Sequence, residues 1–194
     1  ADGLLAVLPL ETGFVVLLLS YLVLLAGNVF HGLTTPDSHM PRRAHSGRML
    51  LVTKLPINEG EQINNVFDAC YVPRDIFLTG ELDAHDIGRL KDGRPAFVNT
   101  LYNCLATPSE RHSFTPIWKP PFVSKIIKED RCHLNGLAME DGVPRYVTAV
   151  SKSDTIDGWR DRRFDGGIVI DVQSAKIVIG GLSMSHSPRL YRGK

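Results

Sequence analysis

Short runs of β-prone residues alternate with glycine-containing turns along most of the chain. After residue 46 these runs lie at 49–54, 76–79, 96–101, 145–150, 167–171 and 176–180. They are rich in Val, Ile, Phe and Tyr, and Asp-Gly or Gly-Gly pairs separate several of them, which is the pattern of strands joined by tight turns. No segment after residue 34 has a helical period over three turns. This part of the chain is therefore predicted to be all-β.

The turns recur at a nearly constant interval. Gly47, Gly93, Gly142 and Gly193 follow one another at intervals of 46, 49 and 51 residues, and each of the first three precedes a β-prone run. A repeat of roughly 40 to 50 residues built of strands and turns is typical of a β-propeller blade. The pattern predicts a partial β-propeller over residues 46–194, with about three blades of four-stranded antiparallel sheet.

The first 33 residues have a different pattern. Residues 14–26 are almost continuously apolar, and the stretch 12–30 has about the length that a helix needs to cross the hydrocarbon of a membrane. No Lys or Arg precedes it, whereas Arg42, Arg43 and Arg48 follow it, which is unlike a secretory signal peptide. The charge asymmetry predicts a single-pass membrane anchor through residues 12–30, with the C-terminal side in the cytoplasm.

Two alternatives to the membrane anchor remain open for this segment. In one it is a buried hydrophobic helix, and in the other it is a stretch that is not native protein. Both alternatives predict a cytoplasmic location. The predicted organisation is a hydrophobic, possible transmembrane helix at 1–33, a polar linker with two prolines at 34–45, and the incomplete propeller domain at 46–194.

Composition narrows the partners that the chain can have. It has 194 residues, room for one domain, and a formal net charge of only +1. No basic stripe with interleaved aromatic residues is present, so no nucleic-acid partner is predicted. Three widely spaced cysteines without a CxxC pair suggest neither a zinc site nor a disulfide framework.

Polar residues recur at one position of the repeat. Asp86, Asn135 and His186 each stand seven residues before a turn glycine. The innermost strand of a propeller blade lines the central channel, so these side chains are predicted to form a ring around it. Because side chains alternate along a strand, His133 faces the same side as Asn135, whereas His85 and Asp86 face opposite sides unless a bulge intervenes. Asp86, His133, Asn135 and His186 are therefore the candidate ligand-binding residues of the channel.

These residues admit more than one chemistry. Asp86 and Asn135 offer carboxylate and amide oxygens, which suit a divalent cation such as calcium. Alternatively, Asn135 forms a tight turn or a satisfied buried hydrogen bond. His85, His133 and His186 suit general-base work or ligation of zinc or iron, or they are hydrogen-bonded structural residues. No nucleophile motif is present, so no catalytic residue is predicted.

Several longer segments carry a family resemblance. They are YVPR from Tyr71, GELDAHDI from Gly80, FVNTLYNCLAT from Phe97, WKPPFVSKI from Trp118, EDRCHLNGLAM from Glu129, DGWRDRR from Asp157 and LSMSHSPRLYRGK from Leu182. On these segments residues 71–194 resemble a largely uncharacterised, mainly bacterial family of conserved hypothetical proteins with a predicted β-propeller domain. Members of that family are longer and continue with further propeller strands. The resemblance therefore implies that this chain is a fragment, and its hydrophobic N-terminus is not part of the family pattern.

A shorter likeness bears on the channel. The tetrapeptide Asn-Gly-Leu-Ala from Asn135 is similar to a motif of six-bladed propellers of the lactonase and strictosidine-synthase-like group. In that group the Asn enters the central channel and can coordinate a divalent cation. The likeness implies the same place for Asn135.

These features are consistent with two functions. The favoured one is a binding or scaffold module without turnover, which holds an unidentified small molecule or protein. The alternative is a metal-dependent propeller hydrolase, similar to a lactonase or esterase, with a divalent cation in the channel. An incomplete propeller also leaves sheet edges open, so missing blades or self-association are expected to cover them.

Overall fold

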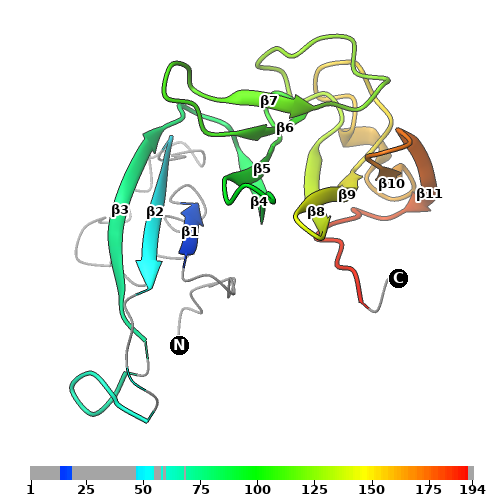
Figure 1. Cartoon of the computed structure of the whole chain (residues 1–194). Helices are drawn as coiled ribbons and strands as arrows, with labels where there is room; N and C mark the ends of the chain where they lie inside the picture. The colour runs from blue at the N-terminus through cyan, green and yellow to red at the C-terminus, as the bar shows by residue number, and fades with distance from the viewer. Residues whose placement is uncertain (1–13, 19–46, 55–57, 59, 68, 192–194) are drawn as a thin grey trace, which may run out of the picture. The chain divides into compact units, whose positions relative to one another are not determined.

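The computed structural model describes residues 14–18, 47–54, 58, 60–67 and 69–191 (Figure 1). The chain divides into two compact units, residues 1–80 and residues 81–194. Within the described residues every regular element is a strand, apart from one 3₁₀ turn at Arg160–Arg162. The prediction of an all-β chain is confirmed.

The first unit contains a three-stranded antiparallel sheet in the order β1-β2-β3. Its strands are β1 (Phe14–Leu18), β2 (Arg48–Lys54) and β3 (Tyr71–Leu78). The predicted N-terminal helix is wrong for Phe14–Leu18, which pairs with residues 49–53 of β2. The sequence FVVLL suits a strand because β-branched and aromatic residues favour the extended backbone, and β2 provides the partners for its hydrogen bonds.

The predicted membrane span gains no support from this unit. Among the residues that the structure describes, no helix is long and apolar enough to cross a membrane. Residues 12–13 and 19–30 of the predicted span lie outside the described residues.

The second unit contains two four-stranded antiparallel sheets. The first has the order β4-β5-β6-β7, with β4 (Ala84–Arg89), β5 (Pro95–Asn99), β6 (Cys104–Thr107) and β7 (Thr115–Trp118). In each sheet, consecutive strands are neighbours, as hairpin connections require.

The second sheet repeats this order along the chain. It consists of β8 (Leu134–Glu140), β9 (Val143–Ala149), β10 (Gly167–Asp171) and β11 (Lys176–Leu182). Its first strand, β8, packs against β4 and β5 of the first sheet. The core between the sheets consists of Ala96, Val98, Leu105, Val123, Cys132, Leu134, Leu137, Val147, Ala149, Ile168 and Ile170. Burial of these apolar side chains holds the two sheets together.

Strand pairing shows how the two sheets correspond. In the first, Ala84 pairs with Asn99 on β5. In the second, Leu134 pairs with Ala149 on β9. The pairing then shifts by one residue in both β4 and β8. After the shift Ile87 of β4 lies opposite Phe97, and Leu137 of β8 lies opposite Val147. Equivalent residues of β4 and β8 are therefore 50 positions apart.

This register differs from the alignment made on the turn glycines. It relates Asn135 to His85, and Gly136 to Asp86. The alignment on turns was one residue out because the turn glycines are not equivalent: both strands of the hairpins are offset by 50 residues, so Gly93 corresponds to Val143 and not to Gly142. The irregularity between Ala84 and Ile87 is the kind of bulge that lets adjacent residues escape strict alternation.

Candidate ligand-binding site

Three histidines from separate parts of the second unit meet near the start of β4 and β8. His85 is the second residue of β4, His133 immediately precedes β8, and His186 follows β11. The ring centroid of His85 lies 5.0 Å from that of His133 and 5.6 Å from that of His186. We call these three side chains the imidazole cluster.

The protein fixes the tautomer of His85. Its Nδ1 lies 2.8 Å from the carbonyl oxygen of Asp83 and 2.8 Å from Oγ1 of Thr100. A carbonyl oxygen only accepts, and the Thr100 hydroxyl already donates to the carbonyl oxygen of Leu134 at 2.5 Å. Nδ1 of His85 therefore carries the proton, which leaves the lone pair of the neutral ring on Nε2.

His133 is held in the same way by a carboxylate. Its Nδ1 lies 2.6 Å from Oδ2 of Asp130, and its backbone N–H donates to Oδ1 of the same residue at 3.0 Å. The ring stacks on Trp159 with centroids 4.1 Å apart. The backbone φ of His133 is +50°, in the left-handed region, where residues other than glycine are uncommon. Such strained conformations are concentrated at functional sites.

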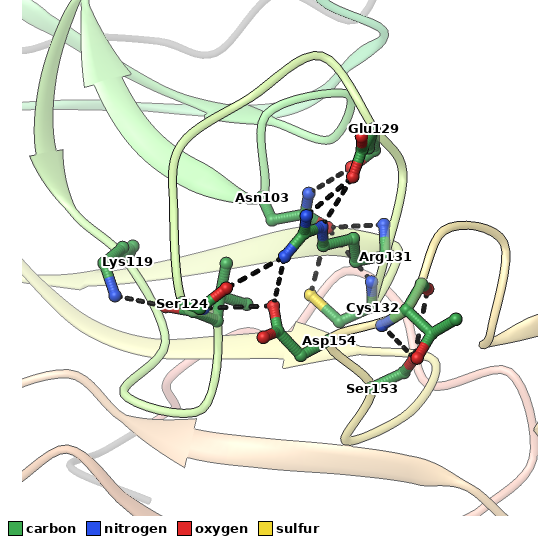
Figure 2. A network of polar contacts seen from close by, with 10 residues as sticks. Asn103, Lys119, Ser124, Glu129, Arg131, Cys132, Ser153 and Asp154 are labelled. Carbon is green, nitrogen blue, oxygen red and sulfur yellow. Dashed lines mark hydrogen bonds and ion pairs between the residues drawn. The ribbon is translucent and has the colours of Figure 1, made fainter.

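A polar network holds the loop that precedes His133 (Figure 2). Oδ1 of Asn103 accepts hydrogen bonds from the backbone N–H groups of Arg131 and Cys132, each at 3.0 Å. The buried Arg131 guanidinium binds Glu129 and Asp154, both at 2.7 Å. Bonds from the Ser124 backbone N–H and from Arg131 lower the pKa of Asp154 to about 2, so this pair stays charged across the neutral range. The network fixes the backbone that carries Asp130 and His133.

Asp86 lies buried beside the cluster and has protein partners on both carboxylate oxygens. Oδ2 accepts from the backbone N–H of Leu137 at 3.0 Å and from Nη1 of Arg189 at 2.9 Å. Oδ1 accepts from the backbone N–H of Ile87 at 2.9 Å. Asp86 therefore links β4, β8 and the segment that follows β11.

Asn135 is fully buried in β8. Its Oδ1 accepts a hydrogen bond from Oγ1 of Thr148 at 2.7 Å. Its Nδ2 is buried and has no hydrogen-bond partner among the described residues. A buried amide donor without a partner is costly, so it marks a place where a water or ligand acceptor would be stabilised.

The segment after β11 crosses the cluster, and we call its residues 183–190 the strap. Ser185 Oγ donates to the carbonyl oxygen of Ala149 at 2.9 Å. Pro188 and the backbone N of Ser187 occupy the space in which Gly136 would carry a Cβ atom; such an atom would lie 2.3 Å from Pro188 Cδ. Together with Arg189, these contacts hold the strap against β8 and β4.

The surroundings of His85 and His186 favour neutral imidazoles. Burial lowers the pKa of His85, and its nearness to His133 adds to this, although Asp83 opposes it. Partial burial and the neighbouring His85 and His133 also lower the pKa of His186. Within the described residues, no hydrogen bond involves Nε2 of His85, His133 or His186. His85 and His186 therefore present hydrogen-bond acceptors rather than cations.

The structure gathers most of the residues predicted for the channel. His133, His186 and Asp86 lie in or beside the cluster, while the oxygen of Asn135 is turned to Thr148. In the part of the chain that the structure describes, no three His, Cys, Asp or Glu side chains are arranged to hold a metal ion. Calcium binding by Asp86 and Asn135 stays a prediction.

Sequence reasoning missed three members of the site. His85 was set aside because strict alternation would turn it away from Asp86, and the register shift in β4 removes that constraint. Asp130 and Trp159 carry no motif of their own. The spacing of Asp130 three residues before His133, with its carboxylate on both the backbone N–H and the ring, is a local signal that could have been recognised.

A comparison with protein families assigns the chain. Residues 28–194 match a domain of unknown function, DUF4915. The chain belongs to this family. The match confirms the resemblance to an uncharacterised family and extends it from residue 71 back to residue 28. Neither the curated proteins nor the solved structures give a match to the DUF4915 chain.

Proposed function

We propose that this DUF4915 domain is a binding module of the β-propeller type, with its ligand site at the imidazole cluster. Two four-stranded sheets with consecutive strand order, whose first strands lie together, are the arrangement expected of neighbouring blades. On this proposal the second unit holds two of about three blades, and further strands complete the ring. The cluster then lies beside the innermost strands.

The observation that carries the binding proposal is the way in which the protein orients His85 and His133 through their Nδ1 atoms. Each Nδ1 is bound to the protein, and within the described residues no hydrogen bond involves either Nε2. A small polar ligand that hydrogen-bonds to both Nε2 atoms at once would suit this pair. Among the residues that the structure describes, no nucleophile completes a catalytic set at the cluster, so the module is proposed to bind without turnover.

The test is a ligand titration followed on the imidazole resonances by NMR. The probes are sugars and polyols, small primary amines, γ-lactones, Ca²⁺ and Zn²⁺. A true ligand shifts the ring signals of His85 and His133 and leaves those of the exposed His112 unchanged.

The matched variant is His133→Asn. Asn tolerates the left-handed backbone and can still donate to Asp130, but it lacks Nε2. Loss of one hydrogen bond should weaken binding by about tenfold. The proposal fails if no probe moves the ring signals, or if binding to His133→Asn is unchanged. Calcium-dependent hydrolysis of the lactones would favour the alternative hydrolase instead.

A further inference from the structure

We infer that the strap, residues 183–190, is a gate over the imidazole cluster, and that the bond between Arg189 and Asp86 is its catch. The inference rests on the proposed binding function and concerns how the same site is opened. The two ends of the strap are attached to the rest of the unit in different ways.

The N-terminal part of the strap is attached through bonds that end on the backbone. The backbone N–H of Met184 donates to the carbonyl oxygen of Arg163 at 2.9 Å, and Oγ of Ser185 donates to that of Ala149. Ser185 is buried. This end stays in place while β9 and the 3₁₀ turn remain folded.

The C-terminal part is attached mainly through one side chain. Arg189 Nη1 donates to Oδ2 of Asp86 at 2.9 Å, and its Nη2 lies 3.4 Å from Oδ1. The Arg189 side chain is 58% exposed, whereas that of Asp86 is 6% exposed. The guanidinium is largely solvated already, and the buried carboxylate keeps two backbone N–H donors when the pair opens, which lowers the cost of opening it. Arg189 can therefore leave while Asp86 keeps its bonds to Leu137 and Ile87.

The residues between these two attachments cover His85. His186 lies against the His85 ring, Pro188 and Ser187 lie on Gly136, and Arg189 ends on the residue next to His85. Within the described residues no backbone hydrogen bond of the segment 186–189 to β4 or β8 is present. Rotation about Ser185 would carry His186 away and open Nε2 of His85 to a ligand.

The test measures access to His85 with diethylpyrocarbonate, which acylates neutral imidazole nitrogen. The rate at each histidine of the full chain is read by peptide mass spectrometry and divided by the rate at His112. Arg189→Gln removes the charge of the catch, and Arg111→Gln, an exposed arginine outside the strap, is the control.

Loss of the catch should raise the relative rate at His85 by about fivefold, and the control should leave it unchanged. High salt should raise the rate in the unmodified protein, because it screens the ion pair, and have little effect on Arg189→Gln. An equal rate in both variants, with circular dichroism showing that both are folded, would overturn the gate.

A second variant keeps the test decisive if Arg189→Gln does not fold. Gly136→Ala pushes Pro188 and Ser187 outward and should also raise the rate at His85. An unchanged rate there overturns the gate as well. Because the reagent reports access without any ligand, a failure of the gate is distinguishable from a failure of the binding proposal, which the titration decides.

Discussion

The two sheets of the second unit share one strand order but have different chemistry at equivalent positions. Where β4 has His85 and Asp86, β8 has Asn135 and Gly136. The acidic residue of the first sheet binds the backbone of the second, and the glycine of the second leaves space for the strap. The two sheets share one backbone arrangement, and the residues that differ between them at equivalent positions form the candidate site.

Equivalent residues also differ in chemistry just before β4 and β8. Asp83 and His133 occupy equivalent positions and both have a left-handed backbone, with φ of +51° and +50°. Asp83 uses its carbonyl oxygen to orient His85, whereas His133 contributes its own ring. The same backbone conformation thus positions a supporting carbonyl group in the first sheet and a ring of the imidazole cluster in the second.

The largest effect is expected at the loop that carries His133. Asn103→Ala leaves the N–H groups of Arg131 and Cys132 without an acceptor, and both residues are buried. The free energy of unfolding should fall by on the order of 2–4 kcal/mol. Chemical denaturation measures it, with the exposed Asp165→Ala as a control expected to change it by less than about 0.5 kcal/mol. A small loss for Asn103→Ala would show that this network does not hold the loop.

A glycine comparison between the sheets comes next. Gly136→Ala places Cβ 2.4 Å from Thr148 Oγ1 and 2.8 Å from the backbone N of Ser187, so it should cost about 1–3 kcal/mol of unfolding free energy. Gly88→Ala in the first sheet meets only the ends of side chains, chiefly Met139, which can turn aside. Thermal unfolding of both variants tests this, and equal losses would contradict the packing of the strap on β8.

Asp86→Asn changes both roles of that side chain. The single amide oxygen accepts from only one of the Leu137 and Ile87 N–H groups, and the ion pair with Arg189 is lost. We expect a loss of about 2 kcal/mol, of which about 1 kcal/mol comes from the ion pair because Arg189 is largely exposed. In a double-mutant cycle with Arg189→Gln the coupling should equal that ion-pair part. Additive effects of the two substitutions would show that the pair contributes nothing.

The smallest effect is the dependence of stability on pH. Folding lowers the pKa of His85 and of His186, so the unfolded chain binds more protons as the pH falls below the ordinary histidine value of about 6.5. The contribution of these residues to stability is therefore present above that value and is lost as the pH falls through the lowered pKa. His85→Asn should reduce the slope of unfolding free energy against pH in this window. An unchanged slope would show that His85 is not neutral through burial.

The sequence allowed the all-β class and the repeat to be predicted, because alternation and turn glycines are local signals. It also pointed to His186 through its place before a turn glycine, and to His133 through its alternation with Asn135. It did not give the register of β4 and β8, since the turn glycines Gly93 and Gly142 used for the alignment stand at positions that differ by one residue in the two hairpins. The role of His85 depends on that register. The pairing of Asp86 with Arg189 joins residues 103 positions apart and has no local signature.

The helix prediction is wrong for Phe14–Leu18 for a related reason. A short, continuously apolar run fits a buried strand as well as a helix, and periodicity alone does not separate them. In Phe14–Leu18 the pairing with β2 decides for the strand.

The central claim is that the His85 and His133 rings are neighbours held by the protein through Nδ1, which leaves both Nε2 atoms for a ligand. Long-range ¹H–¹⁵N NMR of the histidine rings near neutral pH tests it most directly. We predict protonated Nδ1 in both rings and unprotonated Nε2 in His85, with a nuclear Overhauser effect between the protons of the two rings. Protonated Nε2 in His85, or no contact between the rings, would contradict the account.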